Sequence, residues 1–253
     1  MRDGTRKTLR RGKNEREEVM WVAIIPRSIF LLEYAEMGTM HFVVPDNELL
    51  YDYYTASDKF KMIDNGAYEL GRPLPDEEFV YLAAQIDADE MVAPDVLMDG
   101  ERSLELTKHF LESYKPSWCR VCAVPQGRNP EEFIEYYGKV AKLDVDTIGL
   151  PIWLQKKFGA RFAVFSKLRK KNLLRRDVAH HLLGLDDFNE LKQYPKGAIR
   201  SVDTSLPLTL AYHKVERPVD GLSRVPVNAR FDGFQHFLAR RLTGRLLQIA
   251  SSC

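Results

Sequence analysis

Eight short apolar segments recur along the chain, and most of them end at a polar or turn residue. Amphipathic patterns with a helical period lie between several of these segments. Strands that alternate with helices predict a parallel sheet with right-handed crossover connections. The predicted strands are Trp21 to Pro26, His41 to Pro45, Phe60 to Asp64, Glu90 to Asp95, Arg120 to Gln126, Thr147 to Pro151, Val178 to Gly184 and Ala198 to Asp203.

A closed (β/α)8 barrel, the TIM-type α/β fold, is the economical arrangement of eight such strands in 253 residues. The alternative is an open doubly wound sheet, which normally carries a glycine-rich phosphate loop after its first strand. Here the first strand ends in Pro26, Arg27 and Ser28 instead. Helices are predicted over residues 75–87, 103–114, 130–142 and 187–193, with one or two closing helices in 231–250.

The composition is that of an ordinary globular protein, with 45% hydrophobic and 29% charged residues. The longest apolar runs are too short to cross a bilayer, and no sustained apolar segment follows the basic N-terminus. Three cysteines are too few for a disulfide framework, which favours a cytoplasmic location. Residues 1–18 lack apolar periodicity, so we predict a flexible basic arm before one barrel domain over 19–253.

The net charge of +1 conceals an uneven distribution. The segment 155–176 contains nine Lys and Arg residues and no acid, whereas 76–112 is rich in Asp and Glu. This segregation suits a polyanionic ligand, and the alternative is a solvated helix face. Because unopposed cations repel one another, we expect this segment to contact a nucleic-acid backbone through Lys156, Lys157, Arg161, Lys167, Arg169, Lys170 and Lys171.

Four of the predicted strands carry a carboxylate or an amide near their C-terminal end, namely Asp64, Asp95, Gln126 and Asp203. In barrels of this type, catalytic groups gather at those strand ends. Each residue taken singly has a plain alternative as a loop cap or a partner for backbone groups. Four of them at one mouth indicate a polar site.

Five motifs in this region resemble, in order, those of the tRNA-guanine transglycosylases, also called queuine tRNA-ribosyltransferases. The resemblance covers residues 60 to 207. Asp64-Asn65-Gly66-Ala67-Tyr68-Glu69 looks like their DSGG(F/Y)Q motif, Val124-Pro125-Gln126-Gly127 like their QG strand, Ile148-Gly149-Leu150 like their glycine-containing sixth strand, His181-Leu182-Leu183-Gly184 like their YLMG, and Val202-Asp203-Thr204-Ser205-Leu206-Pro207 like their FDCVLP.

The chain also departs from that family. The tRNA enzymes carry a CxCxxC…His zinc subdomain beyond the nucleophile strand, whereas the only cysteine after Asp203 is Cys253. Their basic PTR continuation is replaced by Pro207, Leu208 and Thr209, and the chain is shorter. These departures resemble the compact phage-type relatives, the DpdA-like 7-deazaguanine transglycosylases that act on DNA. A tRNA substrate is the alternative.

The resemblance implies that Asp203 is the nucleophile that captures the sugar carbon and that Asp64 manages the protons. It also implies that a guanine-like base is recognised at a pocket formed by Tyr68, Asp95, Gln126, Gly127, Gly149, Leu183 and Gly184. The partners would be DNA, with the target base extruded from its helix, and a free 7-deazaguanine base. No metal or other cofactor is implied.

Two further hypotheses stay open: a hydrolase that removes a base without replacing it, and a non-catalytic nucleic-acid-binding barrel within a complex. A magnesium site on Asp64, Asp95 and Asp203 is a weaker alternative. Cys119 and Cys122 form a CxxC, but inside a predicted strand their side chains point to opposite faces. His180 and His181 likewise point to both faces, and we assign neither a catalytic role.

Overall fold

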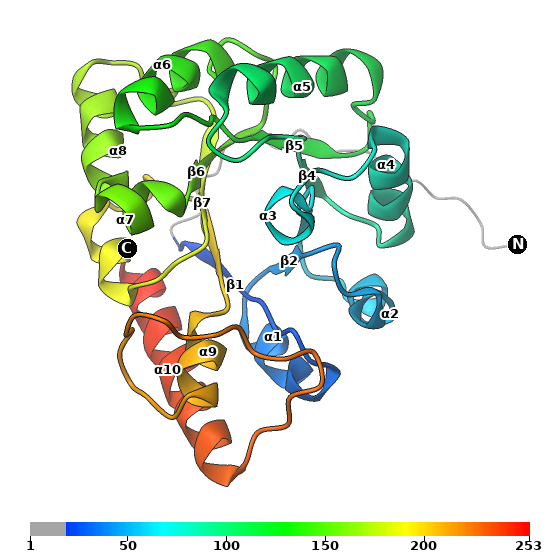
Figure 1. The fold of residues 1–253 in the computed structure, drawn as a ribbon, viewed down its shortest axis with the longest axis vertical. Coiled ribbons are helices and arrows are strands. Elements are labelled where there is room, and N and C mark those ends of the chain that lie inside the picture. The colour runs from blue at the N-terminus through cyan, green and yellow to red at the C-terminus, as the bar shows by residue number, and fades with distance from the viewer. Residues whose placement is uncertain (1–18) are drawn as a thin grey trace, which may run out of the picture.

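The computed structural model describes residues 19–253, so the predicted arm over residues 1–18 lies outside the described residues. Eight parallel strands form one sheet in the order β1-β8-β7-β6-β5-β4-β3-β2 (Figure 1). All eight predicted strands are present. Their bounds are Trp21–Ile24 (β1), His41–Val43 (β2), Lys61–Ile63 (β3), Glu90–Val92 (β4), Arg120–Ala123 (β5), Thr147–Pro151 (β6), Ala179–Leu183 (β7) and Ser201–Thr204 (β8).

The seam between β1 and β2 brings the two ends of the sheet together. The Thr39 amide, two residues before β2, donates to the Val22 carbonyl oxygen at 2.8 Å. In return, the Val22 amide donates to the Thr39 hydroxyl at 2.8 Å. The sheet is therefore a nearly closed barrel, and the predicted TIM-type (β/α)8 fold is confirmed.

Helices connect the strands, and the longer ones begin at side-chain caps. Asn129 caps α6 and Asp99 caps α5, while Asp232 and Gln235 form a capping box at α10. The α-helices are Leu32–Met37 (α1), Tyr51–Ala56 (α2), Ala67–Leu70 (α3), Asp76–Gln85 (α4), Gly100–Ser113 (α5), Pro130–Val140 (α6), Trp153–Phe158 (α7), Arg161–Lys170 (α8), Leu206–Tyr212 (α9) and Gly233–Ser252 (α10), and the 3-10 helices are Ile29–Leu31 (η1), Glu48–Leu50 (η2) and Phe188–Gln193 (η3).

The closing segment is one continuous helix, α10, rather than two. The predicted helix at 187–193 is the 3-10 helix η3. Helix α8 was not predicted, because its many cations mask a buried apolar side formed by Val164, Phe165 and Leu168.

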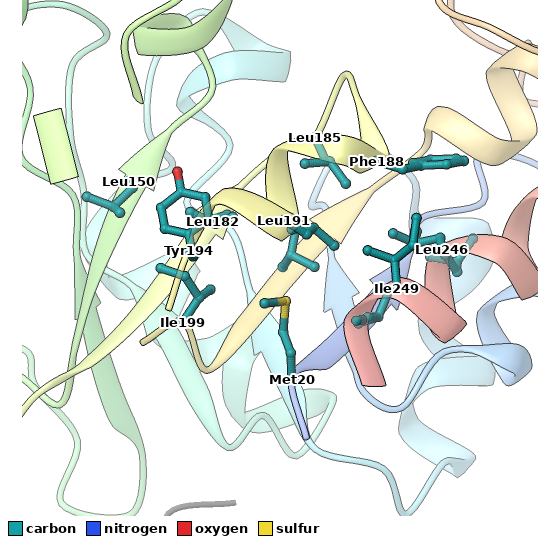
Figure 2. Close-up of a cluster of buried hydrophobic side chains, with 14 of the residues drawn as sticks. Met20, Leu150, Leu182, Leu185, Phe188, Leu191, Tyr194, Ile199, Leu246 and Ile249 are labelled. Atoms are coloured by element: carbon teal, nitrogen blue, oxygen red, sulfur yellow. The ribbon is translucent and has the colours of Figure 1, made fainter. Parts of the chain in front are cut away.

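The strands separate two apolar layers through their two-residue alternation. Met62, Val92 and Cys122 face the barrel interior, where they pack with Ala23, Met40, Phe42 and Val124. The outward-facing residues pack beneath the helices. Figure 2 shows the part of this outer layer where Leu191 of η3 packs beside Leu246 and Ile249 of α10. Each such fully buried aliphatic side chain contributes roughly 1.5–3 kcal/mol, so packing holds the short η3 in place.

The N-terminal end of the barrel is closed by charged and aromatic side chains. Arg200 donates from Nη2 to the buried Glu90 carboxylate at 2.6 Å. Its guanidinium carbon lies 5.5 Å from the ring centroid of Trp21 and 5.6 Å from that of Phe60. The barrel interior therefore opens at the C-terminal ends of the strands. Within residues 19–253, no helix is both long and apolar enough to span a membrane.

Candidate functional site

A cavity of about 850 Å³ lies at the C-terminal ends of the strands. The strand alternation explains why its polar side chains converge there. Asp64 lies two residues beyond the inward-facing Met62, and Gln126 two beyond Val124. Asp203 shares the inward face of β8 with Ser201. The structure thus brings together Asp64, Tyr68, Asp95, Gln126, Leu183, Gly184 and Asp203 as lining residues of one cavity.

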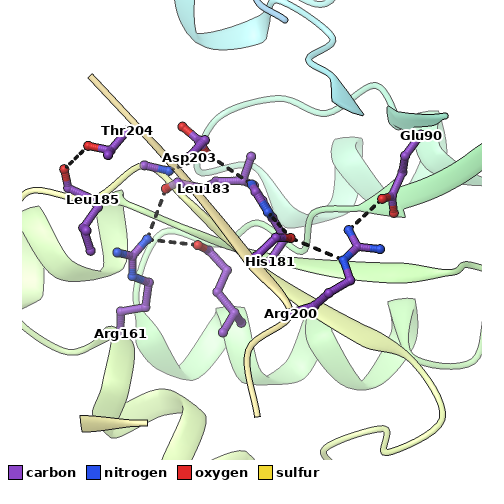
Figure 3. A network of polar contacts seen from close by, with 11 residues as sticks. Glu90, Arg161, His181, Leu183, Leu185, Arg200, Asp203 and Thr204 are labelled. Carbon is purple, nitrogen blue, oxygen red and sulfur yellow. Dashed lines mark hydrogen bonds and ion pairs between the residues drawn. The ribbon is translucent and has the colours of Figure 1, made fainter. Parts of the chain in front are cut away.

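Asp203 is held by one of its two carboxylate oxygens (Figure 3). Its Oδ1 lies 3.0 Å from His181 Nε2 and accepts a hydrogen bond from the Gly184 amide at 2.9 Å. Gly184 has a φ of +73°, which a residue with a side chain rarely adopts. Oδ2 accepts no hydrogen bond from the described residues. One oxygen is therefore fixed while the other is open to the cavity that Asp203 lines.

His181 links Asp203 to Ser201 in the barrel interior. Its Nδ1 lies 2.8 Å from the Ser201 hydroxyl, and that hydroxyl accepts from Arg200 Nε at 3.3 Å. Because arginine only donates, the Ser201 hydrogen is free for Nδ1, and the matching histidine tautomer carries its hydrogen on Nε2. His181 is fully buried and stacks on Phe42 with ring centroids 5.6 Å apart. In this tautomer, Nε2 donates to Asp203 Oδ1.

No role was predicted for His181, but the prediction that His180 and His181 point to opposite faces of the strand is correct. His180 points out of the barrel, where its Nε2 lies 2.8 Å from the Tyr137 hydroxyl. Burial lowers the pKa of His180 to about 4, so this ring is a neutral packing residue. The spacing could have indicated that His181 points inward. His181 lies two residues before Leu183, on the same face of the strand, and Leu183 lines the cavity.

Asp64 begins the turn that follows β3. Its Oδ2 accepts from the Gly66 amide at 3.1 Å, and the Asn65 side chain accepts from the Ala67 amide at 2.7 Å. Burial raises the pKa of Asp64 well above its usual range, and the nearby Glu69 and Asp95 carboxyls shift it further in the same direction. Asp64 is therefore suited to carry a proton at a pH where an ordinary aspartate is ionised.

Asp95 is the acceptor at the centre of an amide cluster. Asn65 Nδ2 donates to its Oδ1 at 2.8 Å, and Gln126 Nε2 donates to its Oδ2 at 2.5 Å. Burial raises the pKa of Asp95 to about 6, although these two donors favour the ionised form. Each oxygen retains a lone pair for a further donor. Asn65 belongs to the motif that begins at Asp64, but the sequence predicted no role for it.

Gln126 is oriented by two donors to its Oε1: the Met98 amide at 3.1 Å and the Trp153 indole at 2.8 Å. This arrangement fixes which end of the side-chain amide faces Asp95. One Nε2 hydrogen bonds to Asp95, so the other is the single group that Gln126 can offer to a ligand. Trp153, which was not predicted as a site residue, therefore helps to orient Gln126.

Tyr68 and Leu183 both line the cavity. Tyr68 is 52% exposed, and the Arg224 guanidinium carbon lies 4.6 Å from its ring centroid. Arg224 belongs to the connection between α9 and α10, of which residues 218–224 line the cavity. It also lies 3.5 Å from Glu69, whose pKa burial raises to about 6. This connection forms part of the cavity wall.

Gly127 and Gly149 were predicted to belong to the base pocket, and that role stays a prediction. Neither is among the residues that line the cavity. A Cβ at Gly127 would lie 2.6 Å from the Phe133 amide, so glycine is needed for the approach of α6. A Cβ at Gly149 would lie 2.7 Å from Leu183 Cδ1, so that side chain packs over this glycine. Both glycines shape the surroundings of the cavity.

Arg161 does not contact a nucleic-acid backbone, and that prediction is wrong. It is fully buried and forms a two-point ion pair with Glu190, at 2.7 Å from Nε and 2.6 Å from Nη2. Its Nη1 donates to the carbonyls of Leu150 on β6 and Leu183 on β7 (Figure 3). The acid that neutralises Arg161 lies outside the cationic segment, so local charge counting did not detect it.

The remaining cations of the segment divide into two groups. Lys156 and Lys157 line the cavity. Lys167, Arg169, Lys170 and Lys171 are exposed on or just after α8 and are not among the cavity residues. Arg175, which follows them, donates to the carbonyls of Ala141 and Leu143 just before β6, so the end of α8 lies at the opposite end of the barrel. Lys167 is also 3.5 Å from Glu131.

The two cysteines of the CxxC point to opposite faces, as predicted. Cys122 packs in the barrel interior, whereas Cys119 packs with the outer layer around α4 and α5. Burial raises the pKa of both thiols. Over the described part of the chain, no group of three or more His, Cys, Asp or Glu side chains is arranged to hold a metal ion.

No family model matches the chain, and no curated protein is significantly similar to it. The function is therefore inferred from the motifs and from the geometry of the cavity.

Proposed function

We propose that the protein exchanges guanine for a 7-deazaguanine base in DNA through a covalent aspartyl-glycosyl intermediate. One observation carries the proposal: Asp203 is held through Oδ1 alone, in the same cavity as an Asp64 whose pKa is raised. A carboxylate with one free oxygen suits attack on a sugar carbon, and a carboxyl that retains its proton suits protonation of a leaving base.

In the first step, Asp203 Oδ2 attacks C1′ as the bond between C1′ and the guanine nitrogen breaks. The bonding electrons pass to the departing base, which takes the proton of Asp64. In the second step, the Asp64 carboxylate removes a proton from the incoming base, whose nitrogen attacks C1′ and releases Asp203. Two inversions restore the original configuration, and both carboxyls return to their starting states.

The amide cluster supplies recognition of the base. The Asp95 carboxylate accepts from the N1–H and exocyclic amino group of a guanine-like edge, and the remaining Gln126 hydrogen donates to O6. Asn65 and Trp153 support this pair through the hydrogen bonds that orient them. Tyr68 and Leu183 enclose the ring, and base stacking on an aromatic face contributes roughly 1–3 kcal/mol.

The region after the nucleophile favours DNA over tRNA as the substrate. Beyond Asp203 the chain forms α9, the connection over 213–232 and α10, where the tRNA enzymes carry their zinc subdomain. The connection lines the cavity with residues 218–224, so this region contributes a short wall instead.

The test is an incorporation assay. The protein is incubated with DNA or tRNA and a labelled 7-deazaguanine base, and the polymer is digested and counted. We expect label in DNA, a denaturant-stable protein–DNA adduct, and loss of both in Asp203→Asn. Asp144→Asn, at a fully exposed aspartate, is the matched control and should leave both unchanged. Label only in tRNA would identify a tRNA enzyme, and release of free guanine without incorporation would identify a hydrolase. An adduct that survives in Asp203→Asn would exclude Asp203 as the nucleophile.

A further inference from the structure

A row of arginine and aromatic side chains runs from the cavity rim onto η1 and is named the arginine–aromatic strip. It consists of Tyr68, Arg224, Arg27, Arg230 and Phe30. The Arg230 guanidinium carbon lies 3.5 Å from the Phe30 ring centroid, and Arg224 lies over Tyr68 in the same way at 4.6 Å. Both rings are exposed, Tyr68 to 52% and Phe30 to 40%.

The strip is continuous with the cavity. Arg27 and Arg224 line the cavity and also a shallow depression formed with Val225 to Asn228. Next to this depression, the Ser28 hydroxyl donates to the Ala229 carbonyl at 2.8 Å, which holds the connection against η1. In Figure 1 the connection, drawn in orange, runs from α9 across towards α1 before it returns to α10.

The charge of the strip is only partly neutralised within the protein. Arg27 pairs with Asp46 at 2.7 Å, and Arg224 lies 3.5 Å from Glu69. Arg230 forms no ion pair with any residue that the structure describes. An exposed ring beside an unneutralised guanidinium offers a flat apolar surface and a positive charge side by side.

We propose that the arginine–aromatic strip is the docking surface for a single-stranded segment of nucleic acid that flanks the base in the cavity. Single strands are bound by this combination, because exposed bases stack on aromatic rings while cations contact the phosphates. Bases within a duplex are stacked on one another and cannot reach the rings. The inference rests on the proposed function only for the identity of the base that enters the cavity.

The experiment measures the binding of a fluorescently labelled single-stranded DNA oligonucleotide by anisotropy at several salt concentrations. Arg230→Gln should weaken binding and flatten the plot of log affinity against log salt by about 0.7, the slope of one phosphate contact on a single strand. Phe30→Ser should weaken binding about fivefold or more without a change in slope. Phe30→Leu, which preserves apolar packing, should show the same loss if stacking is the cause.

Lys196→Gln is the matched control, since it removes one exposed cation that precedes β8, at the opposite end of the barrel. It should leave both affinity and slope unchanged. A flatter slope in Lys196→Gln but not in Arg230→Gln would overturn the proposal, as would tighter binding of duplex than of single-stranded DNA. Unchanged binding in all three strip variants, together with intact base exchange, would reject the strip alone. Loss of binding in those variants without any base exchange by the wild type would reject the proposed function alone.

Discussion

His181 Nε2 lies 3.0 Å from Asp203 Oδ1, within the closed interior of the barrel. The contact continues through Ser201 and Arg200 to the buried Glu90, so it joins the cavity to the opposite end of the barrel (Figure 3). Such a chain restricts the orientation of Asp203 because each member is itself held by the next. His181 is therefore expected to position the reactive carboxylate.

Replacing His181 by Phe should lower kcat for base exchange while the KM for the free base stays close to the wild-type value. Phe preserves the stack on Phe42 but removes the donor to Asp203. The loss of one hydrogen bond to a charged group costs about 1.5–3 kcal/mol, which corresponds to a decrease of roughly 10- to 150-fold. His181→Gln, which restores a donor, should recover part of the rate. His180→Phe on the outer face is the control, and an equal effect of both Phe variants would contradict a positioning role.

The pH profile of base exchange should have an acid limb near 6. Burial raises the pKa of Asp95 to about 6, so the side chain is protonated below that pH and ceases to accept from the base. The KM for the free base should then rise about tenfold for each further pH unit. On the alkaline side, activity should fall as Asp64 loses its proton. Asp95→Asn should remove the acid dependence of KM, and its persistence in that variant would assign the limb to another group.

Replacing Arg161 by Met should destabilise the fold strongly. The change leaves the Glu190 carboxylate buried, with the Tyr194 hydroxyl as its remaining side-chain partner. Breaking a buried ion pair on one side costs about 3–5 kcal/mol of unfolding free energy. The double variant Arg161→Met with Glu190→Met should recover most of this loss, as measured by urea unfolding. If the single variant unfolds like the wild type but binds less oligonucleotide, Arg161 contacts nucleic acid after all.

Gly184→Ala should impair activity more than stability. An alanine at a φ of +73° costs about 1–2 kcal/mol, and its Cβ would lie 3.2 Å from that of Ile152. Movement of this backbone also displaces the amide that donates to Asp203. Gly197→Ala is the matched control, because Gly197 has a φ of +71° and open space around it. Thermal unfolding should show a comparable loss in both, and base exchange should fall only in Gly184→Ala.

The sequence was enough to predict which polar side chains share one cavity, because the two-residue alternation of a strand is a local property. Asp64, Gln126 and Asp203 each follow an inward-facing residue by two positions, and the structure has all three as cavity lining. Gly149 was predicted to belong to the same pocket but is not among the residues that line the cavity. Whether a glycine backbone is exposed depends on neighbouring side chains, here Leu183, which packs over it from the next strand.

For the cationic segment 155–176, the sequence was not enough to predict which charges are neutralised. Its charges are local, but the acids that neutralise them come from elsewhere, with Glu190 opposite Arg161 and Glu131 near Lys167. Likewise, nothing in the sequence connects Arg230 with Phe30, which are 200 residues apart and in contact at 3.5 Å.

By itself, the sequence determined the eight strands, the barrel and the set of carboxyl and amide groups at its mouth, because these follow from periodicities of two and 3.6 residues along the chain. Only the tertiary structure decided which of those groups are fixed by hydrogen bonds or burial, and which residues surround them. His181 donates to Asp203 and Arg161 pairs with Glu190, and each of these contacts joins residues far apart in the chain. The burial that raises the pKa of Asp64 likewise requires the assembled barrel. Such contacts depend on three-dimensional distance, which local patterns do not encode.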